Sequence, residues 1–121
     1  MSEAIEHNTA AACWPAILVH EGEPELEYLP DSASWQRVAA LNGAGIVNSA
    51  CLIDSTGRVF MSGAGADGRR VLLPRGDRKS LVEVLGLVKA HAAQAGSCCV
   101  AKLYAPSIGD ALAIVASLQN G

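Results

Sequence analysis

The sequence predicts a single α/β domain, more closely an α+β domain, with a mixed sheet and helices packed on it. Half of the 121 residues are apolar and only 17% are charged, so the chain can bury one core. Short β-rich runs alternate with stretches of helical periodicity. No internal repeat or linker is present, so we expect one domain over residues 14–121 after a flexible N-terminal tail at 1–13.

The domain should begin with two strands and a helix. The run WPAILVH predicts a strand at 16–20, and the alternation in ELEYL predicts its partner at 25–29. A helix is expected over about 32–42, because the Asp-Ser pair at 31–32 can cap its N-terminus and Gly43 can end it in a left-handed conformation.

The segment SACLIDSTGRVFMS gives the clearest local signal and predicts a hairpin. Two β-rich runs flank DSTGR, in which Gly57 offers the positive φ that a tight bend requires and Asp54 can bond its own backbone. A fifth strand is expected in RRVLL at 69–73, ended by Pro74.

The C-terminal part should contain two helices with a strand between them. Apolar residues at helical spacing predict a helix over about 78–95, closed by Gly96. The run CCVAKLYA predicts a sixth strand at about 98–104, and Ser107 with Asp110 resembles a capping box that opens the last helix. The order is then ββαβββαβα, with a right-handed crossover that makes two of the strands parallel and the sheet mixed.

Net charge and N-terminal composition limit the partners and the compartment. The net charge of −3 and a pI near 5.5 argue against nucleic acid and anionic membranes as the main partners. We find no apolar run of transmembrane length and no signal-peptide pattern at the start, so we expect a cytoplasmic protein with reduced thiols.

Two segments of the chain resemble a known family. WPAILVHEGEPELEYL near the start and KAHAAQAGSCCVAKL towards the end are similar to a family of small proteobacterial proteins of unknown function. The resemblance extends from about Trp14 to Leu118. It implies one folded bacterial domain and assigns no activity and no site residue.

The glycine-rich segment GAGADG matches the pattern G-x-G-x-x-G through Gly63, Gly65 and Gly68. In dinucleotide-binding folds such a loop leads directly into a helix. Here the next residues, RRVLLPRG, leave room for barely two helical turns before Pro74, and the residue before a proline disfavours a helix, so we favour a loop between two strands.

Cys98 and Cys99, with His91 seven residues before the first of them, form the other candidate site. A thiol nucleophile needs a lowered pKa, whereas these cysteines follow a helix C-terminus, whose negative partial charge disfavours a thiolate. We therefore favour core packing and keep these three residues as weak catalytic candidates. The cysteines and histidines show no spacing typical of zinc, and we expect no metal and no cofactor.

Charge is unevenly distributed and guides the functional hypotheses. Residues 1–36 hold seven acids and no Lys or Arg, whereas residues 69–79 hold five bases and one acid. The leading hypothesis is a cytoplasmic protein–protein interaction or self-association domain, such as a homodimer, without catalytic activity. One alternative is a module for small anionic ligands at the 63–70 loop, using Gly65, Gly68, Arg69 and Arg70. The other is a thiol-dependent enzyme or redox sensor using Cys98 or Cys99 with His91.

Overall fold

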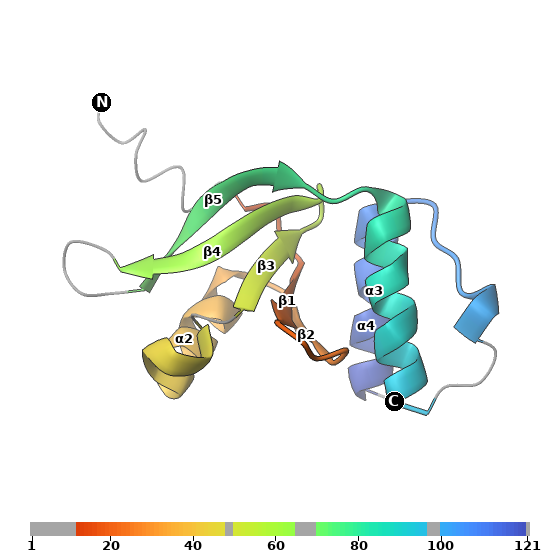
Figure 1. Ribbon diagram of the computed structural model, residues 1–121, viewed down its shortest axis with the longest axis horizontal. Coiled ribbons are helices and arrows are strands. Elements are labelled where there is room, and N and C mark those ends of the chain that lie inside the picture. The colour runs from red at the N-terminus through yellow and green to blue at the C-terminus, as the bar shows by residue number, and fades with distance from the viewer. Residues whose placement is uncertain (1–11, 48–49, 65–69, 97–99, 121) are drawn as a thin grey trace.

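A computed structural model describes residues 12–47, 50–64, 70–96 and 100–120 (Figure 1). Five strands form one sheet in the order β2-β1-β3-β4-β5, and every pairing among the described residues is antiparallel. The strands are β1 (Ala16–His20), β2 (Leu26–Leu29), β3 (Ala50–Asp54), β4 (Arg58–Ala64) and β5 (Arg70–Arg78).

Helices lie on both faces of this sheet. One face carries α2 (Ser32–Val47), and the other carries α3 (Leu81–Gln94) and α4 (Ile108–Asn120), which pack side by side (Figure 1). A short 3-10 helix, η1 (Val100–Lys102), lies between α3 and α4 in the chain.

The sheet therefore separates two apolar cores. Because successive residues of a strand face opposite sides, Leu18 and Leu52 pack toward α2 while Ile17 and Ile53 pack toward α3 and α4. Phe60 lies fully buried in the α2 core. The α3/α4 core is aliphatic and includes Val84, Val88, Ala111, Leu112 and Val115.

The predicted fold class is confirmed: the chain forms one small α+β domain with helices on a sheet. Two element boundaries were predicted wrongly. The helix α2 continues past Gly43 to Val47, so this glycine does not end it. Strand β5 continues through Pro74 to Arg78, which is compatible with proline because β5 is an edge strand.

The predicted sixth strand and the mixed sheet are also wrong. Residues 100–102 form the 3-10 helix η1, while the Cys98–Cys99 part of the predicted strand lies outside the described residues. Without that strand there is no parallel crossover, and the sheet is antiparallel throughout the described chain. The order of the first seven elements agrees with the prediction.

Asp54 organises the bend between β3 and β4. Its carboxylate is fully buried and accepts hydrogen bonds from the backbone N–H groups of Thr56 and Arg58, and from the Thr56 hydroxyl. It also accepts one from the Cys13 N–H at 2.9 Å. Ala12 is buried in the α2 core, so residues 12 and 13 pack on the domain although the predicted tail included them. The domain boundary itself stays a prediction.

The two edges of the sheet differ. At the β2 edge, the Leu26 N–H donates to His91 Nδ1 of α3 at 3.0 Å, and the Tyr28 N–H donates to Gln119 Oε1 of α4 at 2.8 Å. Side chains of both helices thus satisfy the outward donors of this edge strand. At the other end of the sheet, β5 pairs with β4 on one side and has no strand on its other side within the described chain.

Candidate functional site

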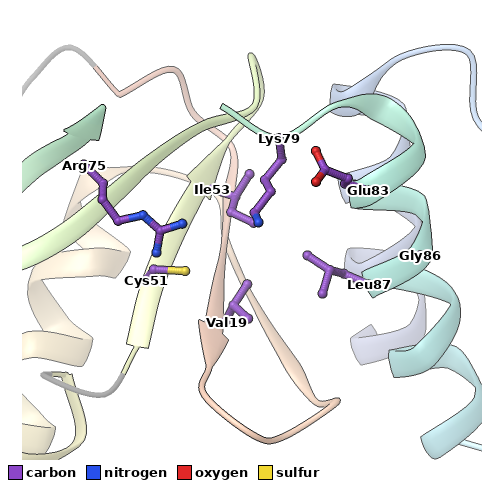
Figure 2. A pocket seen from close by; sticks show the side chains of 8 residues that line it. All are labelled: Val19, Cys51, Ile53, Arg75, Lys79, Glu83, Gly86 and Leu87. Atoms are coloured by element: carbon purple, nitrogen blue, oxygen red, sulfur yellow. The ribbon is translucent and has the colours of Figure 1, made fainter. Parts of the chain in front are cut away.

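A groove of about 370 Å³ opens between the sheet and α3 (Figure 2). Its volume is within the range of small-molecule sites. The lining residues come from four strands or loops and one helix, and they are Val19, Cys51, Ile53, Arg75, Lys79, Glu83, Gly86 and Leu87.

The register of the sheet builds the floor of this groove. Val19 pairs with Cys51, Cys51 with Met61, and Met61 with Leu73, so these four side chains form one row across β1, β3, β4 and β5. We call this row the cross-sheet row. Val19 and Cys51 lie beneath the groove, whereas Met61 and Leu73 are 45% and 49% exposed because α3 and α4 do not reach over them.

The first turn of α3 builds the opposite wall. Ser80 is the N-cap residue: its hydroxyl accepts the Glu83 N–H, and the Ser80 N–H donates to Glu83 Oε1 at 2.8 Å. This capping box satisfies the N–H groups of Ser80 and Glu83, and its hydrogen bond to the Glu83 carboxylate keeps the pKa of Glu83 below its ordinary value. About one turn after Glu83, Gly86 and Leu87 face the groove.

Two cations lie at the rim. Figure 2 shows the side chains of Arg75 and Lys79 pointing into the space over Cys51 and Val19. Arg75 Nε donates to Asp77 Oδ1 at 2.7 Å, and this pairing lowers the pKa of Asp77 to about 2. The Lys79 ammonium has no hydrogen bond or ion pair with any described residue.

Cys51 contributes a neutral thiol. Burial raises its pKa, and the nearby charges of Arg75 and Lys79 offset only part of this effect. A protonated, half-buried thiol behaves as a small apolar group, so the floor of the groove is apolar and its rim is charged.

None of the predicted site residues is among the described residues that line this groove. Gly65, Gly68 and Arg69 lie outside the described residues, and Arg70 begins β5 with a side chain that is likewise outside them. The ligand site expected at the 63–70 loop therefore stays a prediction.

The thiol hypothesis also stays a prediction, because Cys98 and Cys99 lie outside the described residues. His91 is buried on the inward face of α3, as its spacing predicted, and its Nδ1 accepts the hydrogen bond from Leu26. Among the residues that the structure describes, no three His, Cys, Asp or Glu side chains are grouped to hold a metal ion. Within the same residues, none of the helices has the length and apolarity to cross a membrane.

Sequence reasoning missed the groove although it found part of its chemistry. Arg75 and Lys79 belong to the basic cluster noted at 69–79. Cys51 gave no signal, because only the pairing of β3 with β1 and the position of α3 show that it lies beneath these two cations.

Comparison with known proteins gives a family. A search of curated proteins found no match. A solved structure described as "NMR structure of the protein from Shewanella Amazonensis" is similar over 88% of this chain and 90% of its own, with 28% identity and a TM-score of 0.62. The model of the family DUF4144, described as a protein structure with unknown function, matches residues 14–115. The chain therefore belongs to the DUF4144 family, which confirms the resemblance of its two segments to a family of unknown function.

Proposed function

We propose that this protein is an interaction domain that adds an extended, acidic segment of a partner protein to its sheet at the edge of β5. In this mode of recognition, backbone hydrogen bonds of a free edge give affinity and neighbouring side chains give specificity. Binding is the whole of the proposal, and no catalytic step belongs to it.

The difference between the two sheet edges carries the proposal. An uncovered edge presents a row of free N–H and C=O groups, and proteins normally cover such a row or blunt it. The β2 edge is covered, since His91 and Gln119 accept its outward N–H groups. The nine-residue β5 is the opposite edge, with no strand on its far side within the described chain.

Charge supports an acidic partner. Strand β5 and the residue after it contain Arg70, Arg75, Arg78 and Lys79 against a single acid, Asp77. A facing strand that carries Glu or Asp would be attracted, because opposite charges across a strand pair are favourable.

The same features disfavour a second copy at this edge. Two β5 strands facing each other would bring like charges together, and Pro74 has no N–H to donate. The β2 edge of a second copy is also poorly suited to pair with β5, because its outward N–H groups at Leu26 and Tyr28 already have acceptors. These points favour a different protein over self-association.

Amide protection of β5 tests the proposal. The probes are a short peptide that alternates Glu and Val, its Lys-Val counterpart, and the Glu-Val peptide N-methylated at alternate residues. We expect the first peptide alone to slow hydrogen exchange at β5 amides and to perturb their NMR shifts. The double variant Arg75→Glu/Arg78→Glu should reverse the preference to the Lys-Val peptide, whereas Arg37→Glu on α2 should not.

Three results would overturn it. The first is an equal rate of hydrogen exchange at the β5 amides with and without the Glu-Val peptide. The second is equal binding of the N-methylated peptide, which would exclude strand addition. The third is a dimer in light scattering that dissociates in the β5 double variant, which would make a second copy the occupant.

A further inference from the structure

We propose that the groove between α3 and the sheet binds a small amphipathic carboxylate, with its apolar body on the floor at Val19 and Cys51 and its carboxylate at Lys79. The groove shares Arg75 and Lys79 with the basic residues near the β5 edge, but the inference does not depend on the proposed partner binding.

The floor and far wall of the groove favour an apolar body. Val19, Ile53 and Leu87 present aliphatic side chains, and the neutral thiol of Cys51 adds another weakly polar surface. A cavity of about 370 Å³ that is bounded in this way suits a compact ligand with a hydrocarbon chain or ring.

The hydrogen bonds already made by the charged side chains at the rim indicate which charge the ligand should have. The Glu83 carboxylate is engaged by the Ser80 N–H in the capping box, and that of Asp77 is engaged by Arg75. Lys79 has no such partner among the described residues, and Arg75 keeps its Nη1 free of hydrogen bonds there. The uncommitted donors are therefore cationic, and an anion complements them.

A single carboxylate fits these donors better than a phosphate ester or nucleotide. Polyanion sites usually add the free N–H groups of a helix N-terminus to their cations. At α3 one of these groups, the Glu83 N–H, is already bonded to the Ser80 hydroxyl and is not available to a ligand. One ammonium and one guanidinium nitrogen match the two oxygens of a carboxylate.

The cross-sheet row gives a direction in which the ligand can lengthen. From Cys51 the row continues over the exposed side chains of Met61 and Leu73. A longer hydrocarbon chain would cover more of this surface, so affinity should rise with each methylene by up to about fourfold.

Binding of straight-chain carboxylates tests the inference. We would titrate hexanoate and octanoate, below the concentrations at which they form micelles, against the matched alcohols and alkyltrimethylammonium salts at constant ionic strength. NMR shifts of the methyl groups of Val19 and Leu87 report the site. We expect octanoate to bind more tightly than hexanoate, the alcohols about tenfold more weakly or worse, and the cations not at all.

Two variants separate the charge and the shape of the site. Lys79→Gln should remove the preference for carboxylate over alcohol, whereas Lys102→Gln on η1, an exposed lysine outside the groove, should leave it unchanged. Gly86→Leu should abolish binding, because a Cβ at Gly86 meets no atom within 4 Å and the side chain would occupy the groove. This variant should also keep the fold, since leucine favours a helix more than glycine does.

The inference is overturned if alcohols and carboxylates bind equally, if Lys79→Gln leaves the preference intact, or if Gly86→Leu still binds. Shifts that appear equally at Val82 and Tyr104, which are 79% and 72% exposed and lie outside the groove, would show general adsorption to apolar surface and would also overturn it. None of these results depends on exchange at β5 amides, so the two proposals fail independently.

Discussion

His91 and Leu26, which are 65 residues apart in the chain, are joined by a hydrogen bond from the Leu26 N–H to His91 Nδ1 at 3.0 Å. Because Nδ1 accepts here, a neutral His91 carries its proton on Nε2. The bond ties the last turn of α3 to the edge strand β2, and it gives this buried histidine a structural role at that edge.

Replacing His91 by alanine should destabilise the fold by about 2–4 kcal/mol, because a buried N–H loses its acceptor and a cavity forms in the α3/α4 core. Chemical denaturation measures the loss, and hydrogen exchange at the Leu26 amide should become faster. Gln119→Ala is the matched control: it removes the acceptor of the exposed Tyr28 bond and should cost less. An unchanged Leu26 exchange rate in His91→Ala would contradict the assigned role.

Asp54 should be the most sensitive carboxylate of the chain. Asp54→Ala removes the acceptor of four hydrogen bonds that hold the β3–β4 bend and the segment around Cys13, and we expect a loss of about 3 kcal/mol or more. Denaturant unfolding measures it against Asp110→Ala, which alters an exposed helix cap. Equal losses in the two variants would show that the buried network adds nothing.

Acid should destabilise the protein in part through Asp77. Its pKa falls from 3.8 to about 2 in the folded state because of the bond with Arg75. A lowered folded-state pKa means that the stabilisation is complete above the unfolded value and is lost as the pH falls toward 2. Asp77→Asn should therefore flatten the decline of Tm with acid over this range, by a small amount because the pair is exposed. Glu21→Gln is the control, and an identical decline in both variants would refute the prediction.

Gly57 should tolerate alanine less well than Gly22. Both have positive φ, 89° and 80°, so both variants incur the strain of a left-handed conformation, about 1–2 kcal/mol. At Gly57 the new Cβ would also collide with the Lys79 carbonyl oxygen, whereas at Gly22 it meets nothing within 4 Å. The difference in unfolding free energy between the two alanine variants isolates this close approach. A difference near zero would mean that the backbone at Gly57 and the backbone at Lys79 can move apart without a cost in free energy.

Local patterns predicted the elements that are stabilised locally. The β3–β4 hairpin was predicted from Asp54 and Gly57, and the structure confirms both the carboxylate bonds to the bend and the positive φ. The end of α3 at Gly96 was predicted in the same way, and this glycine also has a positive φ. In these cases the sequence neighbours supply the deciding interactions.

The errors arose where distant contacts decide. Gly43 is helical although its propensity favours a helix end. Residues 100–102 have the apolar composition of a strand but form the 3-10 helix η1, and η1 contacts α3. The strand end predicted at Pro74 was wrong because β5 is an edge strand, where proline is tolerated. Only the pairing order of the sheet shows that β5 lies at an edge.

The groove depends on the same long-range order. The positive charges of Arg75 and Lys79 were visible in the sequence, but their position over Cys51 follows from the register that aligns β1, β3, β4 and β5. The spacing of His91 in its helix predicted that it is buried. Its hydrogen bond with Leu26 could not be predicted, because no local pattern identifies a donor that is 65 residues away.

The covering of β2 by His91 and Gln119 also limits stoichiometry. A sheet that is open at both edges can continue from one molecule to the next and grow into a fibre, because each added strand exposes a new edge. Here the helices of each molecule occupy the donors at one end of the sheet, so strand pairing at β5 cannot be propagated through β2. A copy of this protein that was added at β5 would therefore offer no free donor at Leu26 or Tyr28 to the next copy.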